Sequence, residues 1–167
     1  MTEERTTYRE RTPWPGWVNA IFWGACVLGA YPLLAGWDNT LPLLGRLVAV
    51  ASIVTLCVAI RTLLGGLTVL VQETGIFMHL GSVRLVKTRV AFADIVQLES
   101  VQYRPLRDFG GWGVRGFGKK KAWSARGDRA VRVTLNDDRQ IYIGSDHPQR
   151  LEERIRAAAA DQLGKYA

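Results

Sequence analysis

The chain is poor in the side chains from which metal sites and many catalytic sites are built. It has two cysteines and two histidines among 167 residues. Cys26 and Cys57 both lie inside apolar runs, which excludes a disulfide-stapled scaffold and a cysteine zinc site. His79 and His147 have no nearby His, Asp or Glu at a metal-ligand spacing. We therefore expect no catalytic residues, no metal and no cofactor.

Charge is scarce in the first part of the chain. Between residues 17 and 71 the formal charges are Asp38, Arg46 and Arg61. Residues 17–37 and 41–64 form two apolar runs, and each is long enough as a helix to span a hydrocarbon core of roughly 30 Å. Because so short a link joins them, the two runs predict a transmembrane helical hairpin.

Three features refine this hairpin. Arg46 and Arg61 lie near the ends of the second run, where long side chains reach the headgroups. Small residues, among them Gly24 and Gly29, recur at spacings of four and permit close helix packing. We favour packing within the hairpin over a homo-oligomer interface. A signal peptide is the rival interpretation of the first run, but that run is too long and a second run follows directly.

Positive residues set the predicted orientation. Residues 1–16 form a tail that carries Arg5, Arg9 and Arg11, and residues 62–167 hold 17 Lys and Arg against 11 Asp and Glu. Cytoplasmic segments next to membrane spans are enriched in Lys and Arg. We therefore expect a multi-pass protein of the cell membrane with both termini in the cytoplasm.

Short apolar runs separated by turn residues follow the hairpin and indicate a cytoplasmic domain over residues 66–163. Near its end, Asp146 and Pro148 predict the start of a helix, and Leu151 and Ile155 begin an apolar stripe along it. The fold class is α+β: about seven antiparallel strands in a bent sheet or partly open barrel, capped by the C-terminal helix. Strands are expected at 67–73, 76–80, from 83, 90–92, 95–103, 112–117, 130–135 and 140–143.

Three later segments carry a resemblance to a known family. They are YRPLRDFGGWGVR at residues 103–115, SARGDRAV at 124–131 and IGSDHP at 143–148. Together with the two preceding helices, they resemble the bacterial pleckstrin-homology-like membrane proteins. The resemblance implies a seven-stranded, strongly bent sheet with a C-terminal helix, and little biochemistry. Lipid-binding pleckstrin-homology domains hold inositol phosphates with a basic loop between their first two strands, whereas here that connection is Thr74-Gly75.

Two motifs suggest chemistry but have simpler explanations. Residues 111–116 satisfy the G-x-G-x-x-G pattern of dinucleotide sites, yet the following Phe117-Gly118 and three lysines do not begin the required helix. We interpret these glycines as positions for tight bends. Ser145-Asp146-His147 contains the residue types of a hydrolase triad, but adjacent residues do not line up as one, and helix capping explains them better.

The strongest signal is a basic, aromatic stretch from residue 102 to 126, which holds seven Lys and Arg against the single Asp108. Beside a bilayer, each such cation contributes about 1 kcal/mol of attraction to an anionic leaflet, and aromatic rings settle at the interface. Positive-inside bias in a solvated loop is an equally weighted alternative, and nucleic acid is not the expected partner. The candidate lipid- or partner-binding residues are Arg104, Arg107, Trp112, Arg115, Lys119, Lys120, Lys121, Trp123 and Arg126.

Two functions remain open. The first is a non-enzymatic membrane protein whose basic domain contacts anionic membrane lipid and a protein partner, with self-assembly into a homo-oligomer as one form of that contact. The alternative is an accessory or regulatory subunit of a membrane enzyme or transporter complex, docked through a sheet edge or the Trp-rich loop. A membrane-embedded enzyme acting on lipid lacks a supporting cluster of acid, base, nucleophile or metal ligands in the sequence.

Overall fold

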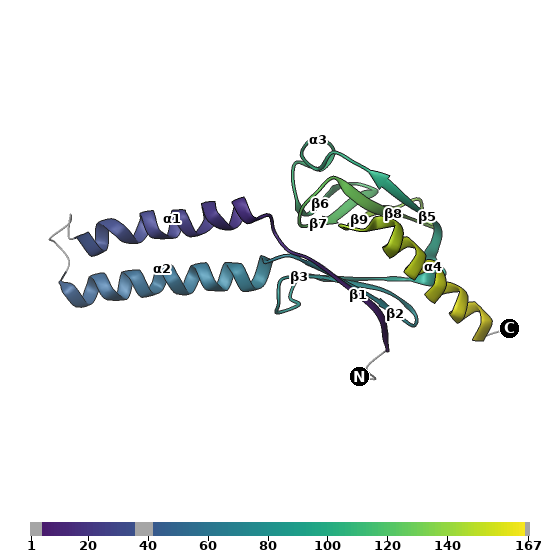
Figure 1. Ribbon diagram of the computed structural model, residues 1–167, viewed down its shortest axis with the longest axis horizontal. Helices are drawn as coiled ribbons and strands as arrows, with labels where there is room; N and C mark the ends of the chain where they lie inside the picture. Colours follow the sequence, from purple (N-terminus) through teal and green to yellow (C-terminus); the bar gives the residue numbers. More distant parts are fainter. Residues whose placement is uncertain (1–4, 36–41, 166–167) are drawn as a thin grey trace.

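The structure, a computed structural model, describes residues 5–35 and 42–165, and the predicted link at 38–40 lies outside them. Two long helices, α1 (Gly16–Ala35) and α2 (Leu43–Leu64), lie side by side and project from an α+β domain (Figure 1). Both are long and apolar enough to cross a membrane. The predicted helical hairpin is therefore present, with bounds close to the expected ones.

The apolar side chains of the two helices point outward. Leu28 of α1 is 74% exposed and Leu43 of α2 is 73% exposed. A core helix of a soluble protein would bury such residues, whereas a lipid-facing helix exposes them.

Two details of the hairpin differ from the sequence-based expectation. A disulfide joins Cys26 of α1 to Cys57 of α2. This bond was not predicted, because the sequence shows the two cysteines only within separate apolar runs. The small-residue prediction is wrong at Gly24 and Gly29: an added Cβ at either position would meet no atom within 4 Å. These glycines therefore do not bring α1 close to α2.

The segment before α1 is not a tail. Residues Thr6–Thr12 form strand β1, which pairs antiparallel with β2 (Leu67–Gln72) and places Thr12 opposite Leu67. The chain thus leaves the sheet through β1, passes along the helix pair and returns through β2 (Figure 1). The prediction of a tail over residues 1–16 is wrong for this stretch, because the polar sequence TTYRERT carries no apolar strand pattern.

The first sheet has the order β1-β2-β3-β4, with β3 at Gly75–Leu80 and β4 at Lys87–Ala91. The predicted strands at 67–73 and 76–80 are confirmed by β2 and β3. The strand expected from Val83 starts four residues later, because Gly81 and Arg84 both have positive φ and turn the chain. A 3-10 turn at Phe92–Asp94 then leads into the second sheet.

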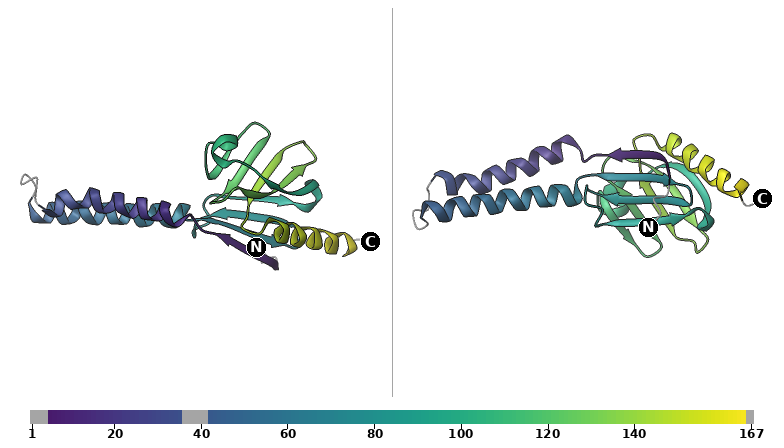
Figure 2. Two further views of the ribbon diagram at one scale, coloured as in Figure 1. Left: turned by 45° about the horizontal axis from the view of Figure 1, so that its top comes forward. Right: turned by 90° about the horizontal axis from the view of Figure 1, so that it is seen from below.

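The second sheet has the order β5-β8-β9-β7-β6, and its strands run across those of the first (Figure 2). Strand β7 pairs parallel with β9, so the prediction of only antiparallel strands is wrong. The described residues form nine strands in two sheets, more than the expected number of about seven. The strands expected from 83 and at 90–92 are one strand, β4. The additional strands are β1 and β7, and β7 contains two of the lysines from the basic stretch. The bounds are β5 Ile95–Gln102, β6 Gly113–Phe117, β7 Lys120–Ser124, β8 Arg129–Leu135 and β9 Gln140–Gly144.

The main core lies between the sheets and under the C-terminal helix α4 (Pro148–Lys165). Leu151 and Ile155 of α4 are fully buried in it, which confirms the predicted apolar stripe and the capping helix. At about 25 cal/mol per Å² of apolar surface, each such side chain stabilises the fold by roughly 2–3 kcal/mol.

A second, smaller cluster covers the other face of the second sheet. A short helix that was not predicted, α3 (Pro105–Phe109), packs there through Phe109. The centroid of the Phe109 ring lies 5.1 Å from the centroid of the Tyr142 ring and 5.9 Å from that of the Tyr103 ring. This aromatic packing fixes the start of the glycine-rich segment that follows α3.

Candidate functional site

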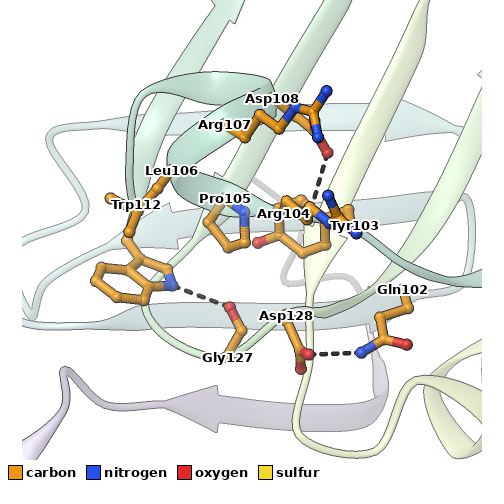
Figure 3. A pocket seen from close by; sticks show the side chains of 10 residues that line it. All are labelled: Gln102, Tyr103, Arg104, Pro105, Leu106, Arg107, Asp108, Trp112, Gly127 and Asp128. Atoms are coloured by element: carbon orange, nitrogen blue, oxygen red, sulfur yellow. Dashed lines mark hydrogen bonds between the residues drawn. The ribbon is translucent and has the colours of Figure 1, made fainter.

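Trp112 lies in the glycine-rich loop between α3 and β6, and two contacts hold it. Its indole Nε1 donates a hydrogen bond of 3.0 Å to the carbonyl oxygen of Gly127 (Figure 3). Its ring also forms a T-shaped contact with the ring of Trp17, in the first turn of α1, with 6.1 Å between ring centroids. The loop is therefore fixed at the end of the domain next to the apolar helices.

A pocket of about 1000 Å³ opens beside this tryptophan, and Arg104 and Arg107 line it (Figure 3). Two carboxylates share the lining. Asp108 accepts a hydrogen bond of 2.9 Å from the backbone N–H of Arg104, and Asp128 accepts one of 2.7 Å from the Gln102 amide. Two cations and two carboxylates leave this pocket close to neutral, so charge alone does not make it selective for anions.

The β6–β7 hairpin carries the remaining basic candidates, and Arg115, Lys119, Lys120 and Lys121 are all exposed. β6 is the terminal strand of its sheet and, with β7, lies at the side of the domain nearest the helices (Figure 1). Lys119 Nζ lies 3.4 Å from Asp138 Oδ2. Because both side chains are well exposed, this ion pair contributes little to stability.

A cleft of about 290 Å³ separates β4 from the β6–β7 hairpin. Four cations line it: Arg89 from β4, Arg115 from β6, Lys121 from β7, and Arg139 from the turn before β9. Asp94 is the carboxylate among the described lining residues. A cleft with this excess of positive charge attracts anions more strongly than isolated surface cations do.

Two of these cations were missed by sequence reasoning. Arg89 and Arg139 lie outside the basic stretch at 102–126, and no local motif marks them. Pairing of β3 with β4 places one at the cleft, and the β8–β9 turn places the other. Arg139 also contacts Asp137 in the same turn, which offsets part of its charge.

Two of the predicted binding residues, Trp123 and Arg126, stabilise the fold instead. Trp123 is only 6% exposed and belongs to the main core, so its assignment as a binding residue is corrected to a buried side chain that forms part of the cleft floor. Arg126 donates two hydrogen bonds to Asp146, of 3.1 Å from Nε and 2.6 Å from Nη2. Asp146, predicted as a helix cap, thus binds a guanidinium.

The turn before α4 also binds the N-terminal strand. Glu10 of β1 accepts a hydrogen bond of 2.6 Å from the Ser145 hydroxyl and one of 3.2 Å from the Asp146 backbone N–H. The Ser145 hydroxyl oxygen in turn accepts from the His147 backbone N–H at 3.0 Å. The Ser-Asp-His sequence therefore joins three elements, as expected for a structural turn.

Comparison of the chain with protein-family models, curated proteins and solved structures gives no match. The resemblance to pleckstrin-homology-like membrane proteins accordingly stays a prediction, and the function is argued from the site alone.

Burial shifts the pKa of two side chains of the domain, Tyr103 and His79. Burial raises the pKa of the Tyr103 phenol above its ordinary value of 10.0. Burial also lowers the pKa of His79 below its ordinary value of 6.5, and the positive charge of Arg84 adds to this effect. Among residues 5–35 and 42–165, no group of three His, Cys, Asp or Glu side chains could hold a metal ion. The four cations that line the cleft can bind an anion electrostatically.

Proposed function

We propose that this chain is a non-enzymatic integral protein of the cell membrane, with both termini cytoplasmic. Its basic, pleckstrin-homology-like domain contacts anionic lipid of the inner leaflet and a protein partner, including a second copy of the chain. The observation that carries the proposal is the contact of Trp112 with Trp17, because it holds the basic segment beside the first turn of an apolar helix.

Membrane anchoring is supported by the exposed leucines of the two helices and by β1. A cleaved signal peptide would remove α1 together with the strand before it. β1 pairs with β2 along its length, and Glu10 binds the turn before α4. Cleavage after α1 would therefore expose the edge of the first sheet, whereas an uncleaved anchor keeps the domain complete.

Lipid contact is supported by the cationic cleft and the exposed lysines of β7. Lys121 faces the cleft, and Lys120, the next residue along the strand, points to the opposite face of the sheet. Each cation near an anionic surface contributes about 1 kcal/mol, so the hairpin can bias the domain toward an anionic leaflet without a headgroup-specific pocket.

The lipid proposal is tested with the full chain, since removal of β1 would disturb the fold. The chain is reconstituted in vesicles that contain a trace of spin-labelled anionic phospholipid, and the motionally restricted fraction of that lipid is measured. We expect the K120A/K121A variant to lower this fraction. The same variants are then measured with a spin-labelled neutral phospholipid, for which we expect no change.

The matched control is R150A/R154A, which removes two exposed cations from α4 and lowers the net charge equally. We expect this control to retain the restricted anionic fraction of the unaltered chain. Equal restriction of anionic and neutral lipid by the unaltered chain would contradict the lipid proposal, and so would equal losses in the two double variants.

A second candidate function, an accessory subunit of a membrane enzyme or transporter complex, is favoured by one observation. β6 ends its sheet, and within the described residues it pairs with β7 alone. A terminal strand offers backbone groups to an extended segment of another chain, and Val114 and Arg115 on it are exposed.

This second function predicts that the chain, extracted in a mild detergent, co-purifies with one stoichiometric partner. A V114P variant removes a backbone N–H from β6 and should weaken that association if the strand edge is the docking site. Repeated recovery of the chain alone would count against it. For either function, protease access to the domain only from outside intact cells would overturn the proposed orientation.

A further inference from the structure

The turn between β3 and β4, residues 81–86, exposes three apolar side chains close together. Val83 is 53% exposed, Leu85 is 68% exposed, and Val86 is exposed as well. Single apolar residues are common on protein surfaces, but three within four consecutive residues form a small patch. A contiguous exposed apolar patch is a candidate contact surface.

The turn is fastened to the last turn of α2. The backbone N–H of Ser82 donates a hydrogen bond of 2.7 Å to the Thr62 carbonyl, and that of Gly81 donates one of 2.9 Å to the Gly66 carbonyl. A Cβ at Gly81 would lie 2.2 Å from the Leu63 carbonyl oxygen, so only glycine permits this approach. The apolar patch is therefore held at a fixed position at the domain end of an apolar helix.

The β3–β4 turn and the Trp112 loop lie on opposite sides of the helix hairpin. The β3–β4 turn reaches back toward the helices on the side of α2, whereas α3 and the loop after it lie on the side of α1 (Figure 1). The two segments thus flank the helix hairpin where it enters the domain. If α1 and α2 cross a bilayer, both segments lie at the level of one leaflet surface.

The charges around the patch suit such a surface. Residues 81–87 contain two cations, Arg84 and Lys87, and no carboxylate. Arg61 lies in the last turn of α2, next to Thr62, whose carbonyl binds Ser82 of the β3–β4 turn. Apolar side chains next to cations are the pattern with which peripheral segments enter an anionic interface, the apolar groups below the phosphates and the cations among them.

We propose that the β3–β4 turn inserts Val83 and Leu85 into the boundary between headgroups and acyl chains of the leaflet that α2 leaves. Arg84 and Lys87 then lie at the level of the lipid phosphates. This inference rests on the proposed membrane anchoring. The turn forms a third attachment beside the hairpin and the Trp112 loop, and it fixes the tilt of the domain and the direction in which the cationic cleft opens.

The test measures depth in the bilayer. Nitroxide labels are attached to single cysteines in a C26A/C57A background of the full chain, reconstituted in vesicles of neutral and anionic phospholipid. The L85C label should be several-fold more accessible to oxygen, relative to a water-soluble nickel chelate, than the V96C label. Val96 is the matched control, because it is apolar and 69% exposed but lies on β5, at the far edge of the second sheet.

A third label, L28C, separates this inference from the proposed anchoring. If the label at Leu28 is accessible to oxygen, while the labels at Leu85 and Val96 are equally accessible to the nickel chelate, the insertion is overturned and the anchoring stands. If the label at Leu28 is itself accessible to the chelate, both are overturned. Low access of both reagents to the 85 label would indicate protein packed on the turn, such as a second copy, and would also overturn insertion.

A second measurement avoids the cysteine substitutions. The native chain is reconstituted with a phospholipid that carries a diazirine in its acyl chain, and cross-linked peptides are identified after irradiation. We expect adducts on residues 83–86 and a several-fold lower yield on the peptide that contains Val96. Equal yields on the two peptides would contradict the proposal.

Discussion

Arg126 and Asp146 form a two-pronged ion pair that joins the end of β7 to the turn before α4, with both side chains about one third exposed. The guanidinium binds this carboxylate, and Arg126 is not among the described residues that line the cationic cleft. The same turn binds Glu10 of β1. The pair therefore stabilises the junction of three elements, and Arg126 is a structural residue within the basic stretch.

The first prediction separates this structural role from lipid binding. R126A should lower the free energy of unfolding by roughly 1 kcal/mol, as expected for a partly exposed, bidentate pair. D146N should lower it similarly, and both effects are measured by thermal unfolding in mild detergent. A lipid-binding Arg126 would behave differently, because D146N would free its charge and increase the restricted fraction of anionic lipid.

The second prediction concerns the Trp112 loop. W112A removes both the hydrogen bond to Gly127 and the ring contact with Trp17, so the loop should open. Trypsin should then cleave after Arg107 and Arg115 several-fold faster in the detergent-solubilised chain. W112F keeps a ring but loses the N–H donor, and it should be intermediate.

Cleavage after Arg139, in the β8–β9 turn, serves as the internal control for this experiment. It should be unchanged in both variants, because Arg139 and Trp112 lie at opposite ends of the paired strands. Gln140 pairs with Lys120, whereas Gly113, next to Trp112, pairs with Ser124. A uniform acceleration at all three arginines would indicate general unfolding and contradict a local role for Trp112.

The third prediction compares two glycines with similar backbone conformations, Gly81 at φ 65° and Gly118 at φ 58°. G118A meets no atom within 4 Å and should cost about 1 kcal/mol, the strain of a left-handed alanine. G81A adds a clash with the backbone of α2 and should cost about 1–3 kcal/mol more. Equal losses in thermal unfolding would show that the turn does not pack on α2.

The fourth prediction is a pH dependence from His79. Burial, with Arg84 and Arg9 adding positive charge, lowers the pKa of His79 below 6.5, whereas hydrogen bonds to the backbone of Leu80 and Gly81 act in the opposite direction. The unfolded chain takes up a proton near pH 6.5 and the folded chain only at lower pH. The contribution of neutral His79 to the free energy of unfolding is therefore fully present above about pH 6.5. It is lost as the pH falls through the lower pKa of the folded chain.

Melting temperatures at about pH 7.5 and about pH 5.5 check this sign. The native chain should melt at a lower temperature in acid. H79Q and H79F should both reduce the difference, whereas H147Q should retain it, because His147 is exposed. An unchanged difference in both His79 variants would contradict the prediction.

Strands and helices with a strong local pattern were predictable. The β8–β9 hairpin follows from the alternation of Val131, Val133 and Leu135 with polar residues, and α4 follows from the spacing of Leu151 and Ile155. β1 was not predictable in this way. Its residues are mostly polar, and it becomes a strand because it pairs with the apolar β2 and is held by Glu10.

The candidate site, too, was predictable only in part. The sequence alone determined where positive charge is concentrated, because local composition shows it, and it determined the two apolar helices, because length and hydropathy show them. Only the tertiary structure decided that Trp123 is buried, that Arg126 is paired, and that Arg89 and Arg139 join the cleft. The physical reason is that strand register, face and long-range pairing depend on residues far apart in the chain, which no local pattern records.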